Sequence, residues 1–130
     1  MIHDDYLSVL RSPDPTAPDG AGRPVPVLLA PLSGVTDVHM RRIARACGAS
    51  AVVSEMVAAA EFTRGSVEAT LRAEGGGIAP HVVQLAGCAP EPMGLAARLA
   101  EENGADVIDI NMGCPAKAVT GGGRRLGPHA

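Results

Sequence analysis

Two carboxamide side chains and one thiol each follow an apolar run, which makes them candidates for ligand binding or catalysis. Gln84 follows a Val-Val pair, Asn111 follows the run that ends at Ile110, and Cys114 lies between a glycine and a proline. A carboxamide donates and accepts hydrogen bonds at the same time, which suits the edge of a planar heterocycle. For Gln84 and Asn111, a hydrogen-bonded amide at the end of a strand is an equally good interpretation.

Cys114 is predicted to be the functional thiol. Its glycine and proline neighbours favour a stiff, exposed turn over a position in a packed core. A thiol in ordinary surroundings stays mostly protonated near neutral pH and can act as a general acid, whereas a nearby cation would turn it into a thiolate nucleophile. Cys47, on a predicted apolar helix stripe, and Cys88, in a predicted turn, favour structural roles. Of the three, only Cys114 is predicted to lie beyond the C-terminal end of a strand.

The charged residues near these side chains have less specific interpretations. Asp109 lies within a predicted strand, where a carboxylate needs a partner such as an arginine or backbone donors, and structural and functional roles fit it equally. Glu55 is slightly better explained as a polar loop residue than as an orienting group. Arg41, Arg42 and Arg45 lie mainly off the apolar stripe of their helix, which favours a solvated face over a phosphate-binding patch.

Short apolar runs predict four strands that would position these side chains. They cover residues 27–30, 51–54, 81–85 and 105–110. Their apolar residues are continuous and do not alternate, which is typical of strands buried on both faces of a parallel sheet.

Helices are predicted between the strands. Thr36 is a candidate N-cap for a helix that ends near residue 46 or 47, before Gly48. Its apolar stripe contains Met40, Ile43, Ala44 and Cys47. A short helix or loop-helix is expected over residues 56–62, and a longer helix is expected from residue 90 to the Asn-Gly pair at 103–104.

The alternation of strands and helices, at about 25 residues per unit, indicates right-handed βαβ repeats and a parallel sheet. Two architectures fit: a complete doubly wound sheet of roughly 130 residues, or half of a (β/α)8 barrel of roughly 250. In both, functional residues gather beyond the C-terminal ends of the strands. Segments 31–34, 54–56 and 111–115, together with Gln84, occupy those ends.

Composition sets outer limits on the class of protein. The chain has 130 residues, of which 46% are hydrophobic and 19% are charged, and these near-average fractions argue against disorder. Its net charge of −3 argues against a generally basic nucleic-acid binder. Three cysteines at positions 47, 88 and 114 match no zinc motif and leave one unpaired in any disulfide scheme, so a cytoplasmic setting is expected. Without a signal-like or membrane-spanning run, the chain is expected to be soluble, and residues 1–26 to form a flexible, proline-rich leader.

Residues 27–122 contain four motifs in order: LAPLSGVTD, VVSEMV, VVQLAG and DINMGCPAKAVTGG. With these motifs, the segment resembles the N-terminal half of bacterial tRNA-dihydrouridine synthases. The resemblance implies an α/β chain that forms the N-terminal half of a (β/α)8 TIM barrel. It also implies reduction of the C5–C6 double bond of uridine in tRNA, with FMN as cofactor and NADPH as reductant, and neither a metal nor a membrane. The site residues that it implies are Cys114 as proton donor, Asn111 to place flavin or uracil, Gln84 at the flavin pyrimidine edge, and Pro31, Leu32 and Ser33 along the flavin.

The chain also departs from the family pattern. Ala118 stands where a second lysine is common, and residues 123–130 form a divergent tail. Two alternatives therefore stay open: another FMN-dependent barrel that acts on a small molecule, and a non-catalytic remnant. Because half a barrel leaves the runs at 27–30 and 105–110 as apolar open edges, the isolated chain is expected neither to fold into a stable monomer nor to be active. The oligomeric state, the tRNA and the uridine position are not predicted.

Overall fold

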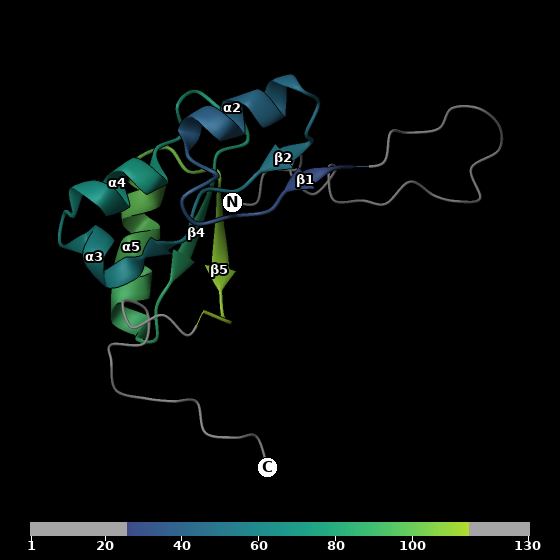
Figure 1. Ribbon diagram of the computed structural model, residues 1–130. Helices are drawn as coiled ribbons and strands as arrows, with labels where there is room; N and C mark the ends of the chain where they lie inside the picture. The colour runs from purple at the N-terminus through teal and green to yellow at the C-terminus, as the bar shows by residue number, and fades with distance from the viewer. Residues whose placement is uncertain (1–25, 115–130) are drawn as a thin grey trace, which may run out of the picture.

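The computed structural model describes residues 26–114 as an α/β unit with parallel strands (Figure 1). Most of the predicted leader, residues 115–122 of the predicted partial barrel and the predicted tail at 123–130 lie outside these residues. The strands are β1 (Leu28–Leu29), β2 (Ala51–Val52), β3 (Val57–Ala58), β4 (Val82–Ala86) and β5 (Val107–Asn111). The helices are α2 (Val38–Ala46), α3 (Ala59–Thr63), α4 (Val67–Ala73) and α5 (Pro90–Glu102).

The strands lie side by side in the order of the chain. β1 pairs with β2, and β4 pairs with both β3 and β5, always in parallel. A parallel bridge between Val53 and Val82 connects β2 to the start of β4. A doubly wound sheet reverses its strand order and has its first strand inside the sheet, whereas a singly wound barrel keeps chain order. The observed order therefore favours barrel-type winding, which periodicity alone left open.

β2 and β3 form one strand path along β4 that is interrupted by a bulge. The pairs Val53–Val82 and Val57–Leu85 show that four steps along this path correspond to three steps along β4. Ser54 satisfies the irregular backbone there: its N–H donates to the Val82 carbonyl at 3.0 Å, and its hydroxyl accepts the Gln84 N–H at 2.9 Å. The predicted helix over 56–62 is therefore partly wrong, because residues 57–58 complete the strand path before α3 begins.

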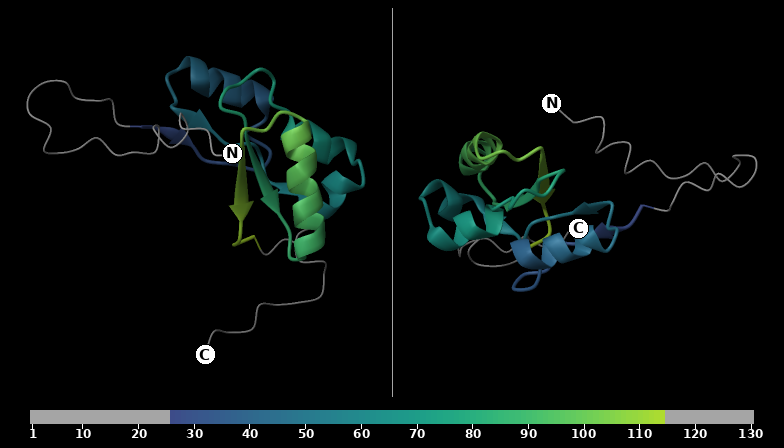
Figure 2. Two further views of the ribbon diagram at one scale, coloured as in Figure 1. Left: turned by 180° about the vertical axis from the view of Figure 1, so that it is seen from behind. Right: turned by 90° about the horizontal axis from the view of Figure 1, so that it is seen from above.

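The main core lies between β3–β4–β5 and the helices α3, α4 and α5, and Figure 2 shows α5 running beside β4 and β5. Small alanines let the helices approach the sheet closely, and the single phenylalanine fills the space between them. Val83, Leu85 and Ile108 belong to this layer. Because side chains alternate along a strand, Gln84, between Val83 and Leu85, and its partner Asp109, next to Ile108, lie on the opposite face of the sheet. The buried members are Val57, Ala59, Phe62, Ala69, Ala73, Val83, Leu85, Ala96 and Ala100.

Helix α2 buries an arginine in place of its predicted apolar stripe. Ile43 is 59% exposed, Met40 and Cys47 are also exposed, and Arg41 is only 1% exposed. Arg41 donates from Nε to the Thr36 carbonyl at 3.1 Å and from Nη2 to the Glu74 carbonyl at 2.7 Å. These bonds compensate the guanidinium for lost water, so an apolar pattern alone misidentified the buried side.

The ends of α2 agree with the sequence in part. Its N-cap is Asp37, not the predicted Thr36, and the Asp37 carboxylate accepts the Met40 N–H at 2.8 Å. Gly48 follows the helix with a φ of 98°, a conformation that glycine adopts without strain, which confirms the predicted stop. Near the same end, Arg45 donates to the Ser50 and Ala79 carbonyls, which precede β2 and β4. It therefore supports loops, contrary to the predicted solvated face.

Both outer strands of the described sheet have open edges. β1 pairs only with β2, and β5 pairs only with β4. Val27 is 60% exposed, Leu28 is 39% exposed and Ile110 is 58% exposed. The prediction that these runs are buried on both faces is therefore wrong within residues 26–114, because nothing there covers the outer sides.

Exposed apolar edges predict self-association of the 130-residue chain. A Leu28→Lys/Ile110→Lys double variant should shift size-exclusion elution toward the monomer over a concentration series, because edge charges disfavour strand pairing between chains. Val67→Lys is the matched control, since Val67 is also exposed but lies on α4, outside both edges. Circular dichroism verifies that helix content is unchanged. Elution that moves equally in the control, or in neither protein, contradicts the prediction.

Candidate functional site

A chain of hydrogen-bonded side chains runs from the middle of β4 and β5 to the C-terminal end of β5. The prediction that Gln84 lies at a strand end is therefore wrong, because β4 continues to Ala86. Gln84 is paired in register with Asp109, and its Nε2 donates to Asp109 Oδ2 at 2.6 Å. Asn111 Nδ2 donates to Gln84 Oε1 at 3.2 Å. The Gly113 N–H then donates to Asn111 Oδ1 at 3.0 Å. We call Asp109, Gln84, Asn111 and the Gly113 N–H the amide relay.

The relay brings together two of the predicted site residues and leads to a third. Gln84 is buried, with 7% of its surface exposed, while Asn111 is half-buried. Cys114 is half-buried and follows the glycine whose N–H ends the relay. Sequence reasoning therefore selected residues that lie close together, although their roles stay predictions.

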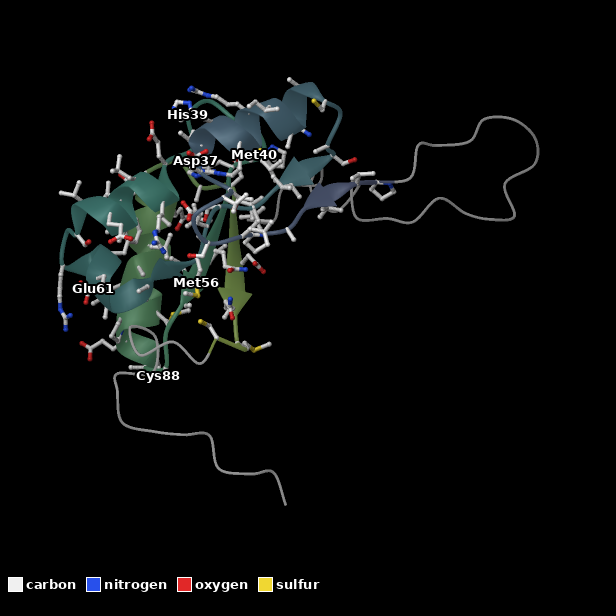
Figure 3. All side chains as sticks on the ribbon, viewed as in Figure 1. Asp37, His39, Met40, Met56, Glu61 and Cys88 are labelled. Atoms are coloured by element: carbon white, nitrogen blue, oxygen red, sulfur yellow. The ribbon has the colours of Figure 1, made fainter. Side chains whose placement is uncertain are left out.

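The stated reason for preferring Cys114 is partly wrong. Cys88 also follows a strand end, two residues after β4, and it is exposed. Figure 3 shows Cys88 beside the start of α5, at the same end of the molecule to which β4 and β5 run. Cys47, predicted on a buried stripe, is exposed and is the C-cap of α2. Proximity to the amide relay, and not strand-end position alone, now distinguishes Cys114.

The loop after β1 contains the other predicted site residues. Pro31 is half-buried, and Leu32 and Ser33 are exposed. The Thr36 hydroxyl accepts the Leu32 N–H at 2.9 Å, and the Leu32 carbonyl accepts the Thr36 N–H at 3.0 Å, which closes a tight turn. Within residues 26–114, no hydrogen bond joins this loop to the amide relay.

Glu55 supports that loop from the bulge between β2 and β3. Its carboxylate is buried and accepts the Gly34 N–H. Burial lowers the pKa of Arg41, while the negative charges of Glu55, Asp37 and Glu74 oppose that shift. Glu55 therefore fits an orienting group, the interpretation that the sequence slightly disfavoured, because its carboxylate joins the segment after β2 to the loop after β1.

Sequence reasoning placed segment 54–56 at a strand end but gave no role to two of its residues, Ser54 and Met56. Met56 lies within 3.7 Å of Asn111 Nδ2 through its sulfur and is labelled in Figure 3. Ser54 binds the backbone of Gln84 at the bulge. Asp109, whose role was left open, has Gln84 as its partner, and within residues 26–114 it binds neither an arginine nor the backbone outside its own ladder. The alternation of Asp109 and Asn111 along β5 was the available signal, since residues two apart share one face.

Within the described part of the chain, no group of three or more His, Cys, Asp or Glu residues is placed to hold a metal ion. None of the helices there combines the length and apolar character that crossing a bilayer requires.

A family model for dihydrouridine synthase matches residues 28–124, well over half of the chain. The chain belongs to the dihydrouridine synthase family. It is 52% identical over 96 residues to a probable tRNA-dihydrouridine synthase of Rhizobium leguminosarum bv. phaseoli, covering 74% of this chain and 30% of that protein. It is 47% identical over 94 residues to tRNA-dihydrouridine synthase B of Pseudomonas syringae pv. tomato, covering 72% of this chain and 28% of that protein. The chain thus spans about 30% of the length of these curated relatives.

The amide relay suits the flavin that this family uses. A carboxamide has two N–H donors and an oxygen with two acceptor sites. After the relay bonds, Gln84 keeps one N–H and one acceptor site, and Asn111 keeps one acceptor site and an N–H that faces only the weak acceptor of the Met56 sulfur at 3.7 Å. The pyrimidine edge of a flavin needs both kinds of partner, so this donor set fits it.

Glu55 should contribute measurably to stability in a chimaera where residues 28–114 replace the matching segment of the Rhizobium relative. Glu55→Ala is expected to lower the free energy of unfolding by about 1–3 kcal/mol, because the Gly34 N–H loses its acceptor and Arg41 loses a nearby charge. The free energy of unfolding of Glu55→Gln should lie between those of the parent chimaera and Glu55→Ala, since glutamine keeps an acceptor oxygen. Urea denaturation measures these differences.

Glu61→Ala is the matched control. Glu61 forms an exposed pair with Arg64 at 2.9 Å, and such pairs contribute about 0–1 kcal/mol. A Glu55→Ala variant that is no less stable than Glu61→Ala would refute the role of Glu55.

Proposed function

We propose that this chain is the N-terminal half of a (β/α)8 barrel that reduces uridine to 5,6-dihydrouridine in tRNA, with FMN as cofactor and NADPH as reductant. The amide relay beside Cys114 is the observation that carries this proposal, because it assembles a heterocycle-binding donor set and a thiol at one end of a parallel sheet. Family membership and strands in chain order support the same conclusion.

In this mechanism, the residues of the chain bind the cofactor and move one proton. Gln84 and Asn111 hold the pyrimidine edge of the flavin and the uracil, and Pro31, Leu32 and Ser33 line the flavin. When bound, FMN supplies the hydride for one carbon of the C5–C6 double bond, with NADPH as the source of the electrons. Cys114 gives the proton of its Sγ to the other carbon, which a protonated thiol can do as a general acid.

We propose a cytoplasmic location for this reaction because its substrate is a tRNA. A tRNA partner and three cysteines without a disulfide within residues 26–114 suit the cytoplasm. Because the chain spans about 30% of its relatives, activity is proposed for the completed barrel, and the 130-residue chain alone is expected to be inactive. A small-molecule substrate is less well supported, since the relatives compared above are named for tRNA.

Cys114→Ala in the chimaera should lower dihydrouridine formation by about 10²- to 10⁴-fold, the usual contribution of a general acid. Flavin binding should persist, because the thiol is not a main anchor. Cys88→Ala and Cys47→Ala are matched controls and should keep near-normal activity. Product is counted by mass spectrometry of tRNA nucleosides. Undiminished product in Cys114→Ala would exclude Cys114 as the proton donor, and an inactive parent chimaera would contradict the proposed function.

Gln84→Leu in the chimaera should weaken FMN binding about 5- to 150-fold, because unpaired polar groups on the ligand cost about 1–3 kcal/mol and a decade of affinity is about 1.4 kcal/mol. Quenching of flavin fluorescence measures the dissociation constant. A thermal melt of each protein separates weaker binding from unfolding. Unchanged affinity in a folded variant would rule out flavin binding by Gln84.

A further inference from the structure

We propose that Asp109 is a positioning residue that sets the orientation of both relay amides and thereby the donor and acceptor pattern they present to a ligand. The inference deepens the proposed function, on which the identity of that ligand rests. In this inference Asp109 acts through Gln84, to which it is bonded at 2.6 Å.

At one end of the relay, Asp109 fixes which amide atom of Gln84, nitrogen or oxygen, faces each neighbour. A carboxylate only accepts hydrogen bonds, so Gln84 must turn its Nε2 toward Asp109. Gln84 Oε1 then faces β5 beyond that point and can accept from Asn111 Nδ2, which lies 3.2 Å away. A single acceptor at Asp109 therefore orders the next two bonds.

At the opposite end of the relay, the Gly113 N–H requires the same orientation of the two amides. The Gly113 N–H can only donate, so Asn111 must present Oδ1 to it, and its Nδ2 is left for Gln84. Rotating either amide by half a turn would place two donors or two acceptors against each other at both of its contacts. The two ends agree, so the orientation of both amides follows from fixed groups outside them.

The burial of Gln84 makes Asp109 hard to replace. Gln84 is 7% exposed, which restricts access of water to its amide. Within residues 26–114, the hydrogen bond to Asp109 is the only one that Gln84 Nε2 donates. Asn111 has a weak alternative in the Met56 sulfur at 3.7 Å, but Gln84 has none. Loss of the acceptor at position 109 would thus free the Gln84 amide.

Asp106 offers a matched control on the same strand path. Its carboxylate also accepts one hydrogen bond from the neighbouring strand segment, the His81 backbone N–H at 2.7 Å. It lies before β5, at the end of the strand away from the relay. Removing Asp106 should therefore affect stability without changing the orientation of either amide.

The first measurement is made without flavin. Side-chain amide signals of Gln84 and Asn111 are recorded by NMR in the chimaera labelled with ¹⁵N at Gln and Asn, and assigned with Gln84→Leu. Asp109→Leu should shift or broaden both signals, and Asp106→Leu should leave both in place. Unmoved signals in a folded Asp109→Leu protein would overturn the inference, whatever the reaction catalysed.

The second measurement is a double-mutant cycle on FMN affinity. Asp109→Leu should weaken binding about tenfold, the size expected from losing one charge-assisted hydrogen bond. In the Gln84→Leu background, it should have almost no further effect, because Asp109 acts through Gln84. A structural role would instead give independent, additive losses, which would refute the proposal.

Asp109→Asn keeps the proposal testable where Asp109→Leu fails to fold. Asparagine retains an acceptor oxygen that can take the Gln84 Nε2–H, so FMN affinity should stay within about threefold of the parent. A loss as large as that of Gln84→Leu would overturn the inference by showing that charge, and not the acceptor position, is required. If Gln84→Leu itself binds FMN normally, the proposed flavin contact fails, whereas the NMR comparison still decides the role of Asp109.

Discussion

The Ser54 hydroxyl accepts the backbone N–H of Gln84 at 2.9 Å, at a point where a regular parallel strand would supply a carbonyl oxygen. This bond lets the path through β2 and β3 gain one residue while β4 stays regular. The extra residue allows Glu55 to leave the sheet toward the loop after β1. β4, which stays straight, keeps Gln84 in register with Asp109. Both the support of the first loop and the amide relay therefore depend on this bulge.

The two ends of the sheet use polar groups differently. Before the strands begin, Arg45 donates to the Ser50 and Ala79 carbonyls, and Arg42 donates to the Gly76 carbonyl, so cations there satisfy loop backbone. Within β4 and at the C-terminal end of β5, Gln84 and Asn111 bond to other side chains and retain capacity for a ligand. This division agrees with the general rule that parallel α/β proteins use the C-terminal ends of their strands for function and the other end for stability.

Much of the fold and part of the site could be predicted from local pattern. All four strand runs, the α5 start at Pro90 and the Gly48 stop follow from apolar runs and from proline and glycine, whose effects are local. Helix α2 was predicted with the wrong face buried, because a periodic pattern does not reveal that Arg41 finds two carbonyls inside. The strand at 57–58 was missed because its pairing depends on Leu85 and Ala86, which are distant in sequence.

By itself, the sequence determined the strand-helix alternation, the family motifs and the three candidate side chains Gln84, Asn111 and Cys114, since each depends on neighbouring residues. Only the tertiary structure decided the strand order, the buried side of α2 and the partner of Asp109. Parallel pairing joins residues about 25 positions apart, and which polar groups meet across two strands depends on register. The register aligned Gln84 with Asp109 and Ala86 with Asn111, and so turned separate polar residues into one connected relay.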